Sequence, residues 1–492
     1  MKRIRITVLL LTLASISWSQ EVIEKLWHPA LYEQELRFLA SDELKGRNTG
    51  TAELDIAARY IAEVFRRNGL LPLPGMDSYF QEVPFKKTTP GTAQIRFMDT
   101  TFQQGDNVVM MSGSAVDEQA VAVFVGFGDS LRSEEINGKY VISIFGTEAI
   151  RSPMEALQTS KEKLDQCKAL GAKGLLEIYT MQTPWSVITR FFNRERLELA
   201  GEDQRGEEQL PYGLMQIPTS RMTELRNNPV RPFRITFSGQ QSIGVPSYNV
   251  LAYKPGNDPK RTDDYVLLSA HYDHIGTRSR AEGEPINQDT IFNGARDNGM
   301  GVIALLSGAD VLSHLPVDRS LIFAAWTAEE KGLLGSSYFV DHSPVPLEKI
   351  RFNLNTDGAG YSDTTVVSIL GFTRVGAETE MEKACQAFGL SVVADPAKEQ
   401  NLFDRSDNVR FAAKGIPAPT FSPGFKSFDQ EIQTYYHQVT DNPGSINYRY
   451  ANKYWKAFVY GAYLIAQMPE DPRWSEGDKY EAAAKSLYGD NY

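Results

Sequence analysis

Three short apolar segments, each followed by side chains able to bind metal, limit the possible folds of this chain more than any other feature. They cover residues 265–270, 320–326 and 350–355. Each has the length of one strand, and continuous apolar character is typical of a strand buried on both faces. Residues 302–306 begin an apolar helix between the first two segments. Because strands and helices alternate, we expect an α/β fold with a mixed, mostly parallel sheet flanked by helices.

The residues that follow these segments belong to the types that commonly bind metal ions. His271 follows the first segment directly, and Asp357 comes soon after the third. Glu329 and Glu330 follow the second segment at a turn, while Asp297 lies in a glycine-rich turn before the apolar helix. In an open α/β sheet, ligands bind beyond the carboxyl ends of the strands. We therefore expect these side chains to converge at one edge of the sheet.

The chemistry of these groups suits zinc, which binds imidazole and carboxylate ligands. Two metal ions about 3.5–4 Å apart can share one carboxylate, and Asp297 is the candidate for that bridge. The adjacent Glu329 and Glu330 allow one carboxylate to bind metal while the other accepts a proton from water. Any one of these residues alone would more often be structural. Their recurrence at successive strand ends and turns favours a two-metal hydrolase.

The same motifs resemble those of the zinc-dependent M28 peptidases, which include bacterial aminopeptidases, glutamate carboxypeptidases and glutaminyl cyclases. The segment from His271 to Asp273 is similar to the family's His-x-Asp motif. The other ligand motifs of the family resemble residues 295–298, 329–330, 355–358 and 436–441. Arg296 departs from the pattern, since many members have a second Asp at that position.

The resemblance implies a role for each of seven residues. Five of them bind two zinc ions: His271, Asp297, Glu330, Asp357 and His437. Asp297 bridges the ions, one of which also takes His271 and Asp357 while the other takes Glu330 and His437. Glu329 is the implied general base, and Asp273 orients His271 through a hydrogen bond. The implied reaction is hydrolysis of peptide substrates, with removal of N-terminal residues by an aminopeptidase as the first choice.

Other functions remain compatible with parts of this pattern. A carboxypeptidase of the same family would need cationic residues near the substrate carboxylate, and Arg280, Arg296 and Arg405 are candidates. A glutaminyl cyclase uses one zinc ion, so the presence of both ligand sets argues against it. A receptor-like member without activity would have lost ligands or the base, which this chain retains.

Two residues near these motifs are expected to be structural. Arg47 ends a segment, residues 39–47, similar to one that packs on the catalytic domain in M28 relatives, and we expect it to form a structural ion pair. His274 follows the His-x-Asp motif directly. We expect it to be a structural or surface residue.

The N-terminus has the pattern of a secretory signal peptide. Three basic residues precede an apolar stretch at residues 6–16, which is too short to span a membrane. Small residues at Ser17 and Ser19 predict cleavage before Gln20, and an uncleaved membrane anchor is the alternative. We therefore expect an exported protein, periplasmic or extracellular, without stable membrane insertion after cleavage.

Changes of pattern along the chain predict its domains. The strand-rich region contains residues 137–139 and 171–174, which resemble parts of a protease-associated (PA) domain. The expected boundaries are a signal peptide at 1–19, a helical segment packing on the catalytic domain at 20–94, a β-rich PA-like insert at 95–245, a zinc peptidase domain at 246–470, and a C-terminal tail at 471–492.

Composition limits the remaining possibilities. With 492 residues and 42% hydrophobic content, the chain can form more than one core. Its net charge of −11 argues against nucleic acid as a partner. Cys167 and Cys385 fall in different expected domains, so we predict two buried free thiols rather than a disulfide. No feature of the sequence indicates an oligomeric state.

Overall fold

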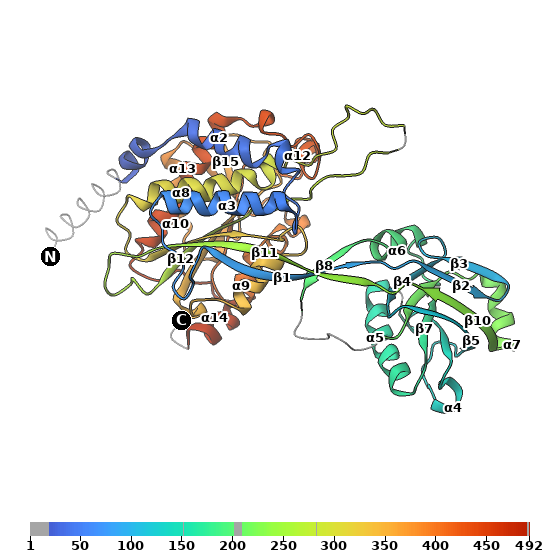
Figure 1. Ribbon diagram of the computed structural model, residues 1–492. Helices are drawn as coiled ribbons and strands as arrows, with labels where there is room; N and C mark the ends of the chain where they lie inside the picture. The colour runs from blue at the N-terminus through green and yellow to red at the C-terminus, as the bar shows by residue number, and fades with distance from the viewer. Residues whose placement is uncertain (1–18, 151, 201–208, 282, 490–491) are drawn as a thin grey trace. The chain divides into compact units, whose positions relative to one another are not determined.

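The computed structural model describes residues 19–150, 152–200, 209–281, 283–489 and 492. The chain divides into a large unit, Met1–Val83 with Pro246–Tyr492, and an inserted unit, Pro84–Val245. Each unit has a mixed sheet flanked by helices (Figure 1), which confirms the predicted α/β fold class. The predicted signal peptide, apart from Ser19, lies outside the described residues.

The sheet of the large unit brings several strand ends to one edge. Its strands are β1 (Phe80–Thr89), β11 (Gln241–Lys254), β12 (Tyr265–His271), β13 (Ser320–Trp326), β14 (Ile350–Thr356), β15 (Val366–Leu370), β16 (Ser391–Ala394) and β17 (Thr420–Pro423). They are arranged in the order β16-β15-β17-β14-β12-β13-β11-β1, and β12 is parallel to both β13 and β14. Because His271 is paired with Trp326, and Ser269 with Asn355, these three strands end side by side.

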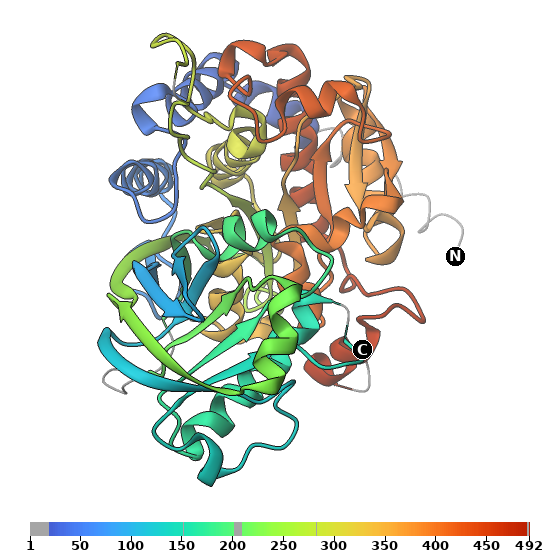
Figure 2. The same ribbon diagram turned by 90° about the vertical axis from the view of Figure 1, so that its right-hand side faces the viewer.

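Helices cover this sheet. The α-helices of the large unit are α2 (Pro29–Leu39), α3 (Ala52–Arg67), α8 (Met300–Ser313), α9 (Leu334–Asp341), α10 (Glu378–Ala387), α11 (Asn408–Ala413), α12 (Gln430–Tyr435), α13 (Tyr448–Ala466) and α14 (Glu481–Tyr488). Short helical turns are η1 (Asp42–Leu44), η3 (Ala295–Gly299), η4 (Leu347–Lys349), η5 (Phe372–Arg374), η6 (Lys398–Gln400), η7 (Leu402–Arg405) and η8 (Pro443–Ser445). Twelve of the 14 residues of α8 are buried, as expected for a helix that is apolar on all sides. In Figures 1 and 2, α8 (yellow) lies between the blue N-terminal helices and the red α13.

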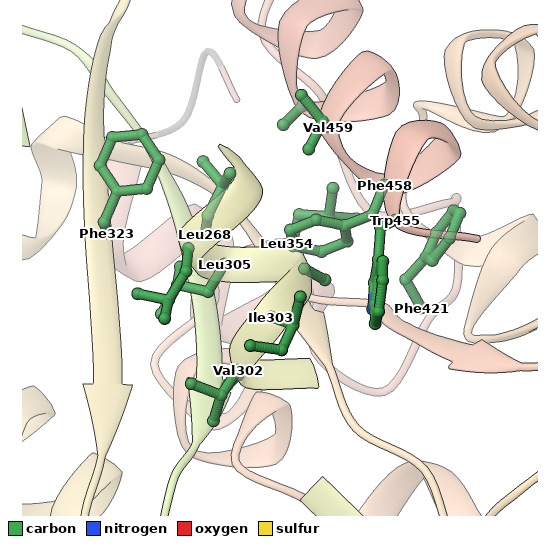
Figure 3. Packing of buried hydrophobic residues seen from close by; sticks show 14 of the residues in the cluster. Leu268, Val302, Ile303, Leu305, Phe323, Leu354, Phe421, Trp455, Phe458 and Val459 are labelled. Carbon is green, nitrogen blue, oxygen red and sulfur yellow. The ribbon is translucent and has the colours of Figure 1, made fainter. Parts of the chain in front are cut away.

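The core between α8 and the sheet holds the strand ends in place. Figure 3 shows Leu268 of β12 and Phe323 of β13 packed near Leu305 of α8. On the α13 side, the Trp455 indole donates a hydrogen bond of 2.9 Å to the Met300 carbonyl at the start of α8. These side chains are fully buried, and burying a side chain of this size stabilises a fold by about 1.5–3 kcal/mol. The ends of β12, β13 and β14 therefore rest on a closely packed apolar layer.

The C-terminal segment after α13 is docked on the large unit. The Trp474 indole donates a 2.9 Å hydrogen bond to the Gly415 carbonyl, and the ring is only 5% exposed. Tyr488 of α14 donates its hydroxyl to the Ile350 carbonyl at the start of β14. The predicted tail is therefore part of the large unit's packing.

The inserted unit contains its own sheet and cores. Its strands are β2 (Ala93–Phe97), β3 (Thr100–Gln103), β4 (Val108–Ser112), β5 (Val116–Phe124), β6 (Tyr140–Ile144), β7 (Gly174–Ile178), β8 (Arg196–Leu199), β9 (Tyr212–Met215) and β10 (Val230–Phe237). Its helices are α4 (Ser133–Ile136), α5 (Pro153–Ala169), α6 (Trp185–Phe192), η2 (Thr219–Arg221) and α7 (Met222–Asn227). The main sheet has the order β3-β2-β10-β5-β6-β7-β9-β4, and its members from β5 to β9 are parallel.

The inserted unit begins at Pro84, ahead of the boundary expected at residue 95. The reason is that β1 continues through this point, and its second half, from Phe85 to Thr88, pairs with β8. Cys167 lies in the inserted unit and Cys385 in the large unit, and both are buried free thiols. Within the described ranges, no helix has the length and apolar character needed to cross a membrane.

Candidate metal centre

The predicted ligands meet at the carboxyl edge of the large unit's sheet. His271 is the last residue of β12, and Asp357 follows β14 directly. Glu329 and Glu330 lie in the turn after β13. The parallel register places these three strand ends next to one another, so short side chains are sufficient to bring the functional groups together.

Asp297 reaches the same place from the turn η3, which leads into α8. The buried carboxylate of Asp441 accepts hydrogen bonds from the backbone amides of Arg296, at 2.9 Å, and Asp297, at 3.2 Å. Burial raises the pKa of Asp441 to about 6, and these two amides oppose the shift. The peptide bond between Asp297 and Asn298 is cis. Asp441 therefore fixes the backbone from which the central carboxylate projects.

The first ligand group consists of His271, Asp297 and Asp357. The Nε2 atom of His271 lies 3.2 Å from Oδ1 of Asp357 and 3.4 Å from Oδ1 of Asp297. Its other ring nitrogen, Nδ1, lies 3.2 Å from the backbone carbonyl of Asp273. A proton on Nδ1 shared with that carbonyl leaves the lone pair of Nε2 directed toward the carboxylates, which is the state needed for metal binding.

The second ligand group consists of His274, Asp297, Glu330 and His437. The Nε2 atom of His437 lies 3.3 Å from Oδ2 of Asp297 and 3.2 Å from Oε1 of Glu330. Asp297 thus offers one carboxylate oxygen to each group. This is the arrangement expected of a carboxylate that bridges two metal ions.

The donor set and its spacing fit metal ions. Zinc binds nitrogen and oxygen ligands at about 2.0–2.2 Å in a tetrahedron, so neighbouring ligand atoms lie about 3.4 Å apart. The contacts that His271 and His437 make with the carboxylates range from 3.2 to 3.4 Å. Within the described part of the chain, the buried Oε1 of Glu330 has no hydrogen-bond partner. A cation between these atoms would satisfy both observations.

The electrostatics also favour a bound cation. Although burial acts in the opposite direction, the carboxylate of Asp357 helps to raise the pKa of His271 well above its usual range. Burial likewise opposes the shift at His437, but Asp297 and Glu330 raise its pKa to about 10. The pKa of Asp297 is lowered because the neighbouring imidazoles outweigh its burial. The carboxylates therefore stabilise positive charge between them.

Glu329 lines the cavity beside the two groups without belonging to either. Burial raises its pKa well above the usual range; His271 opposes this shift and Asp357 adds to it. A carboxylate in this environment is a stronger base than one in water, which suits it to accept a proton. Glu330 behaves differently, since the imidazoles of His274 and His437 outweigh its burial and lower its pKa to about 2.

Asp273 contacts the Glu329–Glu330 turn through its carboxylate. It accepts hydrogen bonds of 3.0 Å from the Glu329 amide, 3.4 Å from the Glu330 amide and 3.0 Å from the Thr49 hydroxyl. Its Oδ1 lies 3.8 Å from Nδ1 of His271, beyond hydrogen-bond distance, so the direct contact with that ring is made by the Asp273 carbonyl. Asp273 thereby positions both glutamates as well as His271.

Arg47 holds together the loops that surround the centre. Its buried guanidinium donates hydrogen bonds to four backbone carbonyls, those of Leu39, Tyr272, Asn293 and Gly294. The ion pair expected from the sequence is replaced by this set of main-chain contacts. Tyr272 and Gly294 flank His271 and Asp297 along the chain, so Arg47 fixes the distance between the two ligand-bearing segments.

Arg296, which precedes Asp297 in the chain, makes structural contacts with neighbouring segments. Its guanidinium is buried and lies 3.5 Å from the ring centre of Tyr435 and 4.4 Å from that of Tyr361. It also donates a 3.1 Å hydrogen bond to the Ser445 carbonyl. Tyr435 ends α12, close to His437 in the chain, so the cation–π contact anchors the segment that carries this ligand.

A cavity of about 350 Å³ opens beside the ligand groups. Its other wall is largely apolar and is formed by Leu333, Leu370, Leu402, Phe425, Phe428 and Ile432. Of the three arginines considered as carboxylate-binding groups, Arg405 lines this cavity; Arg280 and Arg296 do not. Arg405 lies 3.3 Å from the Tyr436 hydroxyl.

His274 is the residue whose location the sequence analysis did not anticipate. Expected to be structural or on the surface, it is fully buried within the second ligand group. The signal available in the sequence was its position directly after the His-x-Asp motif. A histidine in a loop after a strand can also be structural, so the sequence alone did not distinguish the two.

The fold and the site define an α/β domain with a candidate two-metal centre at the carboxyl edge of its sheet. The family model described as Peptidase family M28 matches residues 249–460, so this part of the chain is similar to that family. The match covers β12, β13 and β14 and all five predicted ligands.

Individual relatives agree with this assignment over a limited length. Aminopeptidase YwaD of Bacillus subtilis (strain 168) is 30% identical over 197 residues, which cover 40% of this chain and 40% of that protein. Aminopeptidase Y of Saccharomyces cerevisiae (strain ATCC 204508 / S288c) is 29% identical over 234 residues, or 45% of this chain and 38% of that protein. The chain thus matches about two fifths of the length of these curated relatives.

A solved structure shows the same fold over a greater length. The aminopeptidase from Aneurinibacillus sp. strain AM-1 aligns with a TM-score of 0.53 at 20% identity, covering 93% of this chain and 97% of that one. At this identity the likeness establishes the fold.

Proposed function

We propose that this protein is an exported metallo-aminopeptidase that uses two zinc ions to hydrolyse the bond after the N-terminal residue of a peptide. The observation that carries the proposal is the sharing of Asp297 by two ligand groups in the wall of a cavity that also contains Glu329. Export is supported by the basic and apolar pattern of residues 1–19.

The residues of the centre have distinct tasks in this proposal. His271, Asp297 and Asp357 would hold one zinc ion, and Asp297, Glu330 and His437 the other. Bound zinc would lower the pKa of water and polarise the peptide carbonyl. Glu329 accepts a proton from the attacking water and passes it to the leaving amine, a role that its raised pKa supports. Asp273 keeps Glu329 in place through its backbone amide.

The cavity favours an N-terminal over a C-terminal substrate end. The free amine of a peptide carries a positive charge, which suits a wall rich in carboxylates. The apolar wall that contains Leu402, Phe425 and Phe428 is suited to a hydrophobic first side chain. The relatives named above are called aminopeptidases, which agrees with this choice.

One observation favours the carboxypeptidase alternative. The exposed Arg405 lines the cavity and could pair with a substrate carboxylate. Its guanidinium already contacts the hydroxyl of Tyr436, however, and the other two arginines considered lie away from the cavity. Arg405 alone, among several carboxylates, is a weaker basis for binding a substrate carboxylate than those carboxylates are for binding a free amine.

We also propose that the inserted unit is a PA-like domain. The support is its parallel arrangement from β5 to β9, with α5 between β6 and β7, and the turns around residues 137–139 and 171–174. The amide of Gly138 donates a 2.8 Å hydrogen bond to the carbonyl of Gly171, so these two motif segments meet in the fold.

Peptide hydrolysis tests the proposed function directly. The purified protein is given peptides with a free N-terminus and the same peptides with an acetylated N-terminus, and zinc is measured on the same sample. We expect cleavage of the free peptides only, about two zinc ions per chain, and loss of activity on chelation. Release of C-terminal residues from the acetylated peptides would instead identify a carboxypeptidase, and cleavage of neither set would refute a peptidase function.

A further inference from the structure

His274 is held rigidly inside the centre. Its backbone amide donates a 3.1 Å hydrogen bond to the Arg47 carbonyl, and its ring is fully buried. The ring also packs closely against Gly294, where an added Cβ would come within 2.7 Å of it. The absence of a side chain at Gly294 therefore leaves the space that the imidazole occupies.

The Nδ1 atom of His274 lies near two carboxylates of the second ligand group. Nδ1 lies 2.8 Å from Oε1 of Glu330 and 4.0 Å from Oδ2 of Asp297. Within the described part of the chain, neither ring nitrogen of His274 makes a hydrogen bond, and neither does Oε1 of Glu330. The two groups are thus close together but are not oriented as a hydrogen-bond donor and acceptor. A buried imidazole with both nitrogens unpaired calls for a partner that is absent from the protein chain.

We propose that His274 is a metal ligand, binding through Nδ1 together with Asp297, Glu330 and His437. This inference rests on the proposed two-metal function. Its contacts of 2.8 and 4.0 Å bracket the separation of about 3.4 Å between neighbouring ligands of tetrahedral zinc. The ring of His437, another member of this group, lies nearby, with 5.6 Å between its centre and that of the His274 ring.

The consequence is that the two metal ions have different protein environments. Four protein ligands close a tetrahedral zinc site, whereas three leave a position open for water or substrate. The structure therefore assigns the open position to the metal held by His271, Asp297 and Asp357. The other metal, with its additional imidazole, is the more tightly held and organises the fold around Asp297 and Glu330.

Zinc retention during chelation tests this assignment. Wild-type protein loaded with zinc is dialysed against increasing chelator, and zinc per chain is measured at each step. We expect one ion to leave at low chelator and the second to need at least a tenfold higher concentration. His274→Gln should lose both ions over the same low range. Asp357→Asn should instead lack the first ion and keep the second.

Two controls separate the possible explanations. His314→Gln, at an exposed position after α8, should behave as the wild type. If His274→Gln does not fold, wild-type protein labelled with ¹⁵N-histidine provides the same information, because metal binding shifts the signals of ligated ring nitrogens. Three histidines should shift on zinc loading if His274 is a ligand.

The outcomes distinguish this inference from the proposed function. Two bound zinc ions with only two shifted histidines, or unchanged retention in His274→Gln, would overturn the role of His274 and leave the two-metal proposal intact. Failure of the wild-type protein to bind zinc would refute both. Two ions with three shifted histidines and weakened retention in the variant would establish the four-ligand site.

Discussion

Each unit of this protein contains a buried cluster of charged side chains, and the two clusters are completed in different ways. In the inserted unit, Lys163 lies 2.6 Å from Oε1 of Glu177, which also accepts a 3.1 Å hydrogen bond from Ser143. The other oxygen of Glu177 accepts hydrogen bonds from Tyr212, at 3.0 Å, and from Ser160. The chain itself thus pairs every oxygen of this buried carboxylate.

The cluster in the large unit lacks such a balance. Its two ligand groups contain three carboxylates and three imidazoles but no lysine or arginine, and in the described part of the chain Oε1 of Glu330 and both ring nitrogens of His274 have no hydrogen-bond partner. Burying a charge is costly unless it is paired, and the proposed metal ions would supply the pairing that the chain does not. Buried charged side chains that are fully paired within the chain therefore do not by themselves indicate a functional site. Buried charged side chains that lack partners, and whose ligand atoms converge on one point, do indicate a candidate site.

The largest expected effect follows from removing the proposed base, Glu329, while leaving the proposed metal ligands unchanged. Glu329→Gln keeps the size of the side chain but cannot accept a proton from water. We expect kcat to fall by about 10²–10⁴-fold, with zinc content per chain near that of the wild type. Glu348→Gln, at an exposed position, is the matched control and should retain full activity. Substantial activity in Glu329→Gln would show that another group acts as the base.

A stability defect without loss of zinc is expected when the balanced cluster is broken. Lys163→Met leaves the Glu177 carboxylate buried without its cation, and removing one partner of a buried pair typically costs about 3–5 kcal/mol. Urea unfolding, monitored for the inserted unit by hydrogen exchange, measures the change. Lys161→Met, at an exposed position of the same helix, should alter stability by less than about 0.5 kcal/mol. Equal effects of the two substitutions would contradict a role for the buried pair.

Removal of metal should affect only the unbalanced cluster. A ligand present at 100–1,000 times its Kd stabilises a protein by about 3–4 kcal/mol, so chelation should lower the stability of the large unit by this order. Hydrogen exchange should increase around Asp297 and in the turn at Glu329 and Glu330. Exchange in β6 and β7 should not change. Faster exchange throughout both units would mean that metal does not act locally.

The smallest effect is expected at Glu35, a buried carboxylate whose cationic partner, Arg67, is half exposed. Burial raises its pKa, and Arg67, 3.1 Å away, opposes the shift only in part. Since the folded-state pKa lies above that of the unfolded chain, ionisation of Glu35 destabilises the fold as pH rises through the folded-state value. Glu35→Gln should therefore stabilise the protein on the order of 1 kcal/mol at neutral pH. The gain should vanish below about pH 4, where the carboxyl is protonated in both states.

Thermal unfolding at several pH values measures this effect. Glu33→Gln, on the same helix but partly exposed, is the control and should show a smaller change. A destabilised Glu35→Gln at neutral pH would show that the ion pair with Arg67 outweighs the cost of burial.

The sequence predicted those parts of the centre that depend on local pattern. Continuous apolar segments ended at His271 and shortly before Asp357, and the observed β12 and β14 end at the same points. Neighbouring parallel strands end at the same edge of a sheet, so the side chains that follow them are expected to lie close together there. Strand length and hydrophobicity are local properties, so this much could be inferred from the sequence.

Features that depend on distant contacts could not be predicted in the same way. The placement of His274 requires Arg47 and Gly294, which lie far from it in the chain. Arg47 was expected to form an ion pair with a carboxylate, but its guanidinium instead donates to four backbone carbonyls from three segments of the chain. The start of the inserted unit could not be predicted either, because β1 continues as one strand on both sides of Pro84.

The two points at which the chain enters and leaves the inserted unit are neighbours in the large unit's sheet. The Leu251 amide donates a 2.7 Å hydrogen bond to the Tyr79 carbonyl, and the Asn249 side chain contacts that of Gln81 at 2.9 Å. The inserted unit therefore takes the place of the loop in a hairpin of the large unit's sheet. In evolutionary terms, such an insert can be gained, exchanged or lost as a single unit without changing the register of the strands that carry the candidate metal ligands.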